Sequence, residues 1–223
     1  MSRRHNLDRC PVCAMHETLC ICALVPTIET RTRLQLVMHC REERKPTNTG
    51  ALAARCLTRS SIAIVGDRDR PVTLAPILAD EQPVVLGVAE DAVPLTELAA
   101  STRPIVLVVP DGSWRQANKM RKRVPGLSDM LAVTLPDLGP SNYRLRSEPN
   151  EQGLSTFEAI ARALRILEGD RGEAIERAMI DLFQIMVDRS LWLRGSLATN
   201  DVTGGLPDAA IERNPRSTRA TRG

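Results

Sequence analysis

The chain has 223 residues, of which 43% are hydrophobic, and a formal net charge of +3 at pH 7. This length indicates one main domain, and no apolar run approaches the roughly 18 residues that a membrane-spanning helix needs. Aromatic residues make up only 2% of the chain, which argues against modules that stack RNA bases on an aromatic surface. The N-terminus lacks the apolar stretch of a secretory signal, so we expect a cytoplasmic protein with reduced thiols and no membrane partner.

Four of the six cysteines lie within thirteen residues, in the pattern C-x2-C-x6-C-x-C. Cysteines in a reducing compartment serve metal binding or catalysis more often than disulfides, so this density predicts one tetrahedral, structural zinc ion. The alternatives are four unrelated buried thiols or a redox C-x-x-C pair. His16, inside the cluster, is expected to be solvated rather than a ligand. The predicted zinc ligands are Cys10, Cys13, Cys20 and Cys22.

The next part of the chain alternates between strand patterns and helical patterns. Residues 33–39 have the apolar pattern of a strand, and the polar segment 39–50 follows it on the side of a sheet where ligands bind. Strands separated by helical stretches indicate a mostly parallel sheet with helices on its faces. Further elements are predicted as a helix over 51–59, strands over 62–65, 84–88 and 130–135, and a short helix over 93–100.

The strongest strand pattern is the apolar, β-branched run 105–109, which is typical of a strand buried on both faces. A turn with Asp111 and Gly112 ends it, and glycine lets such a turn come close to a ligand. Ser113 and Gln116 then form a capping box at the start of a helix. Asp111 is therefore expected at the ligand-binding edge of the sheet, beside a helix N-terminus that favours an anionic group.

The helix that follows Ser113 is rich in basic residues, and the small positive charge of the chain permits an RNA partner without requiring one. We interpret this basic run as the leading RNA-binding surface, with a solvated helix face as the alternative. Its members are Arg115, Lys119, Arg121, Lys122 and Arg123.

A loop over 136–153 separates the predicted sheet from the C-terminal helices, and loops of this length in compact domains are usually functional. Ser155 and Glu158 form a second capping box after it. A long amphipathic helix is predicted over 173–194. The remaining residues, 197–223, are low in apolar side chains and are predicted to be disordered.

No G-x-G-x-x-G follows a strand and no P-loop motif occurs, which disfavours Rossmann-type sites and P-loop enzymes. Residues 111–120, Asp-Gly-Ser-Trp-Arg-Gln-Ala-Asn-Lys-Met, resemble the signature of the DTW-domain family, Asp-x-Thr/Ser-Trp followed by a basic helix. The cysteine cluster, the segment 39–50, the Tyr-Arg-Leu-Arg at 143–146 and the segment 154–159 match the family in the same order. The resemblance thus covers residues 8–195.

This resemblance implies a tRNA-uridine aminocarboxypropyltransferase that uses S-adenosylmethionine as the donor and forms 3-(3-amino-3-carboxypropyl)uridine. It also implies a SPOUT-like α/β fold, with a mostly parallel sheet, helices on both faces and a trefoil knot. We therefore expect a zinc-binding segment over 1–28, a catalytic domain over 29–196 and a tail over 197–223. Cys40 stands where many family members have proline, which alters the loop without removing a polar group.

The chemistry of this family suggests roles for particular residues. The imide nitrogen of uridine is a weak nucleophile while it is protonated, so a carboxylate base accelerates its attack, typically by about 10²–10⁴-fold. Asp111 is predicted to be that base; otherwise it binds the donor or caps the turn. Trp114 is expected to anchor its helix in the core, with packing on the adenine or the base as the alternative. Arg144 and Arg146 are expected to hold the donor carboxylate or an RNA phosphate, or else to form surface ion pairs. The residues predicted to bind the donor are Ser113, also a helix cap, Trp114, Tyr143, Arg144, Arg146, and Ser155 and Thr156 through backbone N–H groups.

Two other functions use the same features. A SPOUT-type RNA methyltransferase would transfer the methyl group of the same donor and release adenosylhomocysteine instead of methylthioadenosine. A non-enzymatic, zinc-dependent RNA-binding protein would bind RNA without turnover and tolerate the loss of Asp111. In every case RNA, and for the favoured function tRNA, is the expected partner, and a monomer is favoured.

Overall fold

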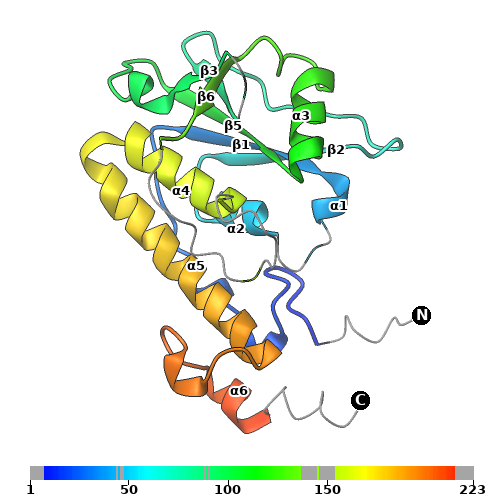
Figure 1. Cartoon of the computed structure of the whole chain (residues 1–223), viewed down its shortest axis with the longest axis vertical. Coiled ribbons are helices and arrows are strands. Elements are labelled where there is room, and N and C mark those ends of the chain that lie inside the picture. The colour runs from blue at the N-terminus through cyan, green and yellow to red at the C-terminus, as the bar shows by residue number, and fades with distance from the viewer. Residues whose placement is uncertain are drawn as a thin grey trace.

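The protein is described by a computed structural model that covers residues 8–43, 45, 48–87, 89, 91–136, 145 and 154–213. Its centre is one parallel sheet of six strands in the order β2-β1-β5-β3-β6-β4 (Figure 1). The strands are β1 (Arg33–His39), β2 (Ser60–Val65), β3 (Gln82–Leu86), β4 (Val93–Pro94), β5 (Ile105–Asp111) and β6 (Leu131–Thr134). The α-helices are α1 (Cys40–Glu43), α2 (Thr49–Arg55), α3 (Trp114–Arg123), α4 (Thr156–Leu167), α5 (Gly172–Arg194) and α6 (Asp208–Arg213). Short 3-10 turns are η2 (Glu17–Leu19), η3 (Cys22–Leu24), η4 (Leu95–Leu98), η5 (Gly169–Arg171) and η6 (Thr199–Asp201).

The apolar run of β5 is explained by its place inside the sheet, between β1 and β3, with both faces covered. Side chains alternate along a strand, so Leu107 and Val109 pack into the core that contains residues of α2, α4 and α5. Val106 and Val108 pack into a second core, together with Met120 of α3. These contacts confirm the predicted parallel sheet with helices on both faces. The SPOUT-like assignment and the knot stay predictions.

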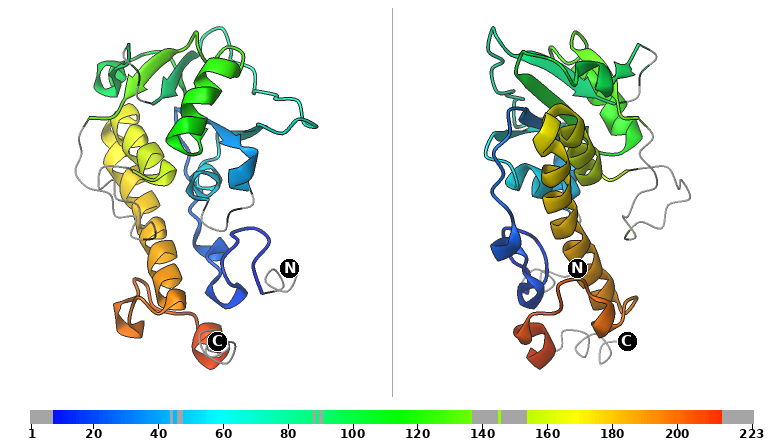
Figure 2. Two further views of the ribbon diagram at one scale, coloured as in Figure 1. Left: turned by 45° about the vertical axis from the view of Figure 1, so that its right-hand side comes forward. Right: turned by 90° about the vertical axis from the view of Figure 1, so that its left-hand side faces the viewer.

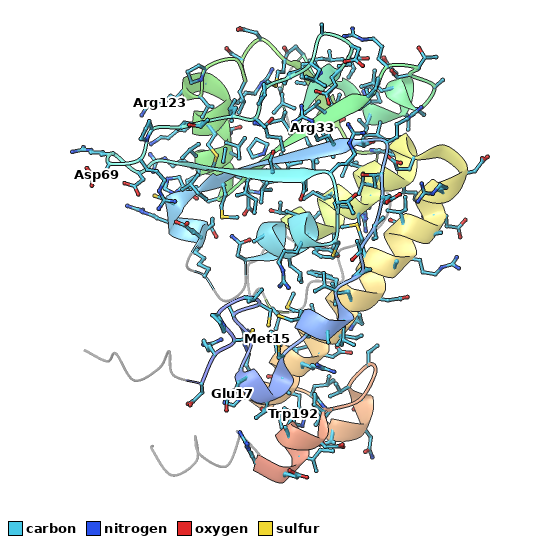
Figure 3. The ribbon with its side chains drawn as sticks, turned by 180° about the vertical axis from the view of Figure 1, so that it is seen from behind. Met15, Glu17, Arg33, Asp69, Arg123 and Trp192 are labelled. Carbon is cyan, nitrogen blue, oxygen red and sulfur yellow. The ribbon has the colours of Figure 1, made fainter. Side chains whose placement is uncertain are left out.

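Helix α5 extends the molecule away from the sheet (Figure 2). One part of it packs on α4, where the rings of Phe183 and Phe157 stack with centroids 4.8 Å apart. It ends at Gly195, whose φ of 82° is the left-handed conformation that glycine adopts readily. Its other end lies beside the N-terminal segment, with Met15, Glu17 and Trp192 at the same end of the molecule (Figure 3). No helix among the described residues is both long and apolar enough to cross a bilayer.

The sheet edge differs from its prediction. The segment 93–100, predicted as a helix, begins as β4, in which Val93 pairs with Val133 of β6, and only Leu95–Leu98 form a 3-10 turn. Pairing with an existing edge strand satisfies this backbone, a long-range effect that the local pattern does not contain.

The C-terminal segment forms regular structure beyond residue 197, where its composition predicts disorder. Residues 199–201 and 208–213 form η6 and α6, so the expected disorder from residue 197 is wrong as far as Arg213. Polar contacts hold this segment to α5: the Asp188 carboxylate accepts hydrogen bonds from the N–H and hydroxyl of Thr203, at 3.1 and 2.6 Å. Residues 214–223 lie outside the described residues.

Candidate active site and metal centre

Asp111 is the last residue of β5 and lies at the carboxyl edge of the sheet, as predicted. Its side chain is buried, with 6% of the residue exposed. The hydroxyl of Thr156 donates to Oδ1 at 2.6 Å, and the side-chain amide of Asn48 donates to Oδ2 at 3.3 Å. Each carboxylate oxygen is therefore held by a residue from a distant part of the chain.

The two donors stand at the starts of two helices. Thr156 is the first residue of α4, and Asn48 caps α2 by accepting the N–H of Ala51 at 2.7 Å through its Oδ1. Helix N-termini carry partial positive charge and favour a nearby anion. Three segments that the sequence singles out separately, the Asp111 turn, the polar segment 39–50 and the stretch beginning at Leu154, thus meet at one carboxylate.

The close approach of α2 to the Asp111 carboxylate requires glycine at residue 50. A Cβ atom at residue 50 would lie 2.7 Å from Oδ2 of Asp111 and 3.1 Å from a methyl carbon of Leu36. We expect Gly50→Ala to lower the stability by about 1–3 kcal/mol through overpacking, although alanine alone would favour the helix by about 1 kcal/mol. Thermal unfolding measures this, with Gly87→Ala as the control, because a Cβ there meets nothing within 4 Å. Unchanged or increased stability of Gly50→Ala would show that the carboxylate tolerates the displacement.

The sequence pattern places the segment 39–50 on the ligand side but does not single out Asn48 or Gly50 as site residues. An asparagine just before a helix of small residues is a cap signal, and its place after the central strand β1 is the hint that the sequence offers. Its second role, holding Asp111 across 63 residues of sequence, depends on the tertiary fold.

Both capping boxes are confirmed. The hydroxyl of Ser113 accepts the N–H of Gln116 at 3.4 Å, and the N–H of Ser113 donates to Oε1 of Gln116 at 2.7 Å. Ser155 is buried, and both its N–H and its hydroxyl donate to Oε2 of Glu158, at 2.9 and 2.8 Å. The N–H of Ser155, which the sequence predicts to face a donor, is thus occupied within the cap.

Trp114 does not anchor its helix in the core; 63% of the residue is exposed, so that expectation is wrong. The first apolar residue of α3 that reaches the second core is Met120, six residues later. Trp114 instead lines a small, shallow groove, bounded by the end of β3, by β6 and by α3. The other residues around the groove are Val85, Leu86, Gly87, Pro110, Ala117, Asn118, Arg121 and Ala132.

The groove and the Asp111 carboxylate lie on opposite faces of the sheet. Pro110 lines the groove, whereas Asp111, one residue later, contacts α2 and α4. Because neighbouring residues of a strand point to opposite faces, β5 separates Trp114 from the cluster around Asp111. The sequence alone does not show that Trp114 and Asp111 lie on opposite faces of the sheet, because the two residues are only three positions apart, in and just after the same turn.

Three of the predicted donor-binding residues, Tyr143, Arg144 and Arg146, lie outside the described residues. Leu145, between them, is described and buried, and its carbonyl accepts a hydrogen bond from Nη1 of Arg194 at 3.2 Å.

A histidine ends the neighbouring strand β1. Burial, and secondarily the positive charge of Arg41, lower the pKa of His39. Its Nδ1 accepts the N–H of Arg41 at 3.2 Å, and its ring packs so closely on Gly66 that a Cβ there would lie 2.9 Å from Nε2. The His39 ring is therefore fixed by the backbone around it.

The four predicted zinc ligands converge. Sγ of Cys10 lies 3.6 Å from Sγ of Cys22, and Sγ of Cys13 lies 3.7 Å from Sγ of Cys20, with all four sulfurs within 4.8 Å of one another. Four thiolates around zinc at bonds of about 2.3 Å stand about 3.8 Å apart in a tetrahedron. The donor set and its spacing therefore fit a closed, structural metal site, and all four cysteines are free. His16 is bound to Thr18 instead, with Nδ1 2.9 Å from the Thr18 hydroxyl oxygen.

Backbone and burial influence these thiols in opposite directions. Hydrogen bonds from the N–H groups of Cys13 and Val12 lower the pKa of the Cys10 thiol to about 6, whereas burial raises the pKa of the Cys20 thiol to about 12. A cation that binds to thiolates offsets the cost of ionising the buried thiol. The convergence of the four sulfurs supports a metal ion rather than four unrelated buried thiols.

The basic run of α3 is mostly exposed, with one exception. Nη2 of Arg121 donates to the carboxylate of Asp91, with an N–O distance of 3.0 Å, so this guanidinium is held by an ion pair. The four remaining cations of the run face solvent: Arg115, Lys119, Lys122 and Arg123.

The chain is similar in sequence to one protein family and to several known proteins. The model of the DTW domain matches residues 7–191. The chain is 30% identical over 169 residues to tRNA-uridine aminocarboxypropyltransferase 2 of Drosophila melanogaster, covering 72% of this chain and 67% of the relative. It is 29% identical to the protein of the same name in Mus musculus, covering 71% of this chain and 56% of the relative. It is 27% identical over 219 residues to tRNA-uridine aminocarboxypropyltransferase A of Arabidopsis thaliana, covering 82% of this chain and 81% of the relative.

No solved structure shows a significant match to the chain. The DTW-domain match nevertheless spans the cysteine cluster, the sheet and most of α5, and it contains every residue that gathers at Asp111. The chain therefore belongs to the DTW-domain family.

Proposed function

We propose that this protein transfers the 3-amino-3-carboxypropyl group of S-adenosylmethionine to a uridine of tRNA and releases methylthioadenosine. Three relatives that align with most of this chain carry the name tRNA-uridine aminocarboxypropyltransferase. The observation that carries the proposal is the buried Asp111 carboxylate, held between Thr156 and Asn48 at the carboxyl edge of a parallel sheet. Ligands bind at this edge in open α/β folds.

The reaction needs one base, which removes a single proton from the uracil ring. The N3–H of uracil gives up its proton, and N3 attacks the carbon beside the sulfonium on the amino-acid side. The carbon–sulfur bond breaks, and its electron pair stays on sulfur, which leaves as a neutral thioether. Asp111 accepts the proton, while Thr156 and Asn48 fix the carboxylate in position. General-base catalysis of this kind contributes about 10²–10⁴-fold.

The surroundings of Asp111 also fit the charges of the donor. A carboxylate suits a sulfonium or ammonium group, and the N-terminus of the twelve-residue helix α4 suits a carboxylate. Mass spectrometry of nucleosides from tRNA incubated with the protein and the donor tests the proposal. We expect aminocarboxypropylated uridine; a methylated nucleoside would indicate a methyltransferase instead, and bound but unmodified tRNA would indicate a binding protein.

Binding of tRNA is expected to depend on the exposed cations of α3. Replacing Lys122 and Arg123 together by Gln should weaken tRNA binding and reduce the slope of log affinity against log salt by about one for each phosphate that is no longer neutralised. Arg123 lies at the opposite end of the molecule from the cysteine segment (Figure 3), so folding at that segment is not affected. Arg177→Gln is the matched control, because Arg177 is an exposed arginine of α5 paired with Glu173. Equal affinities and slopes for the double variant and the control would exclude this surface.

A further inference from the structure

We propose that Trp114 and its groove hold an unpaired nucleobase of the RNA, other than the uridine that reacts. This inference rests on the proposed function, because it assigns a surface to the RNA substrate.

Trp114 differs from the other aromatic residues that the structure describes. Phe157 and Phe183 stack in the core, and Trp192 is 3% exposed, with its Nε1 donating to Thr199. Trp114 alone among these described rings faces solvent. An exposed indole offers a flat, apolar face on which a nucleobase can stack.

The groove has the chemistry of a base pocket. Its floor is apolar, made by the backbone and side chains where β3 and β6 run beside α3. Its rim carries two polar side chains, Asn118 and Arg121. The ion pair with Asp91 holds the Arg121 guanidinium in place, and the amide of Asn118 offers both a donor and an acceptor to a base edge. A base that stacks on the exposed face of Trp114 can therefore present its polar edge to these two side chains.

Charge identifies the partner as a nucleic acid. Helix α3, which forms one wall, contains no acidic residue. Arg115, Lys119 and Lys122 are exposed along it and can neutralise phosphates on either side of a base held by Trp114. A protein or a small apolar ligand would not require this row of cations.

The position of the groove determines its role. Trp114 lies on the face of the sheet opposite Asp111, so a base in the groove is not the one whose N3 loses a proton. Trp114 therefore contributes to docking the RNA rather than to the chemical step, and its loss should raise KM for tRNA by a larger factor than it lowers kcat.

Tryptophan fluorescence tests this inference without turnover. The chain has two tryptophans, so the difference between wild type and Trp114→Phe gives the signal of Trp114. We expect a hairpin RNA with an unpaired loop to quench that signal and a blunt RNA duplex to leave it unchanged. Quenching by S-adenosylmethionine alone, with no quenching by the hairpin, would overturn the inference and place the donor in the groove.

Affinity gives the second measurement. Trp114→Ala should weaken binding of the hairpin by about 5–100-fold, as expected for the loss of one base–aromatic stack, and Trp114→Phe should retain most of the affinity. Equal affinity of wild type and Trp114→Ala would refute the inference. If RNA quenches Trp114 but wild-type protein modifies no tRNA, the proposed function fails and the RNA-binding groove stands.

An independent observation concerns Arg189 of α5, beside the cysteine cluster. The residue is 6% exposed, and its Nη1 donates to the carbonyls of Cys20 and Leu19, at 3.0 and 3.4 Å. Its Nε is buried and has no hydrogen-bond partner among the described residues. A buried cation of this kind is costly unless an anion compensates it.

We infer that Arg189 is a positioning residue for the metal centre and balances its charge. Zinc with four thiolates carries a net charge of −2, which a neighbouring guanidinium offsets, and hydrogen bonds around a site tune its metal affinity. This inference rests on the predicted zinc site.

Competition with a chelator measures the zinc affinity directly. Arg189→Met should bind zinc about 10–100-fold more weakly, Arg189→Lys should lie between Met and wild type, and Arg177→Met should match wild type. If Arg189→Met does not fold, the Lys variant decides the question. Unchanged zinc affinity in the folded Arg189 variants would refute the inference.

Discussion

Asp111→Asn is expected to lower turnover by about two to four orders of magnitude, because the substitution keeps the size of the side chain and removes its basicity. The fold and the donor affinity should survive. The oxygen of the Asn amide can accept one of the two hydrogen bonds that Thr156 and Asn48 now donate to separate carboxylate oxygens, and its NH2 group can donate to the hydroxyl oxygen of Thr156. The measurement is single-turnover kinetics with tRNA and donor both saturating, together with thermal unfolding of the same variant.

Two controls separate catalysis from structure. Asp91→Asn removes an exposed carboxylate that pairs with Arg121 and should leave kcat unchanged. Thr156→Val removes the 2.6 Å hydrogen bond to Asp111 and should reduce kcat less than Asp111→Asn does. Loss of donor binding in Asp111→Asn would make Asp111 a binding residue, and full activity would exclude any catalytic role for it.

Loss of one zinc ligand is expected to have the largest effect on stability. Cys22→Ser should release the metal and lower the thermal stability, because the free energy of metal binding is part of the free energy of folding at such sites. The effect should reach beyond the cysteines, since Leu19 and Ile21 between them are fully buried in the main core and Arg189 of α5 donates to the carbonyl of Cys20.

The measurement is elemental analysis combined with thermal unfolding. We expect about one zinc per chain in wild type and much less in Cys22→Ser. Cys40→Ser is the matched control, because Cys40 is a free cysteine outside the cluster. Absence of zinc from wild-type protein purified without chelators, or equal stability of the two serine variants, would contradict a structural metal site.

Local signals predicted the elements that position the site. The strand through 105–109, the caps Ser113 and Ser155 and the long C-terminal helix depend on neighbouring residues, and the structure confirms each of them. Spacing alone also selected the four cysteines that converge.

The features that could not be predicted from the sequence depend on contacts between distant parts of the chain. Asn48 and Gly50 reach Asp111 only because β1 and β5 are neighbours in the sheet. Trp114 was expected in the core because it is large and apolar, yet the second core takes its helix residues from Met120 onward. The C-terminal segment was expected to be disordered because it is polar, yet polar contacts with Asp188 hold it.

Labelled donor distinguishes transfer of the aminocarboxypropyl group, with Asp111 as the base, from transfer of the methyl group. S-adenosylmethionine is labelled either in the aminocarboxypropyl carbons or in the methyl carbon and incubated with tRNA and wild-type protein. We expect label in tRNA uridine from the first donor only, methylthioadenosine as the coproduct, and a rate that falls in Asp111→Asn. Label in tRNA from the methyl carbon, or transfer by Asp111→Asn at the wild-type rate, would contradict this expectation.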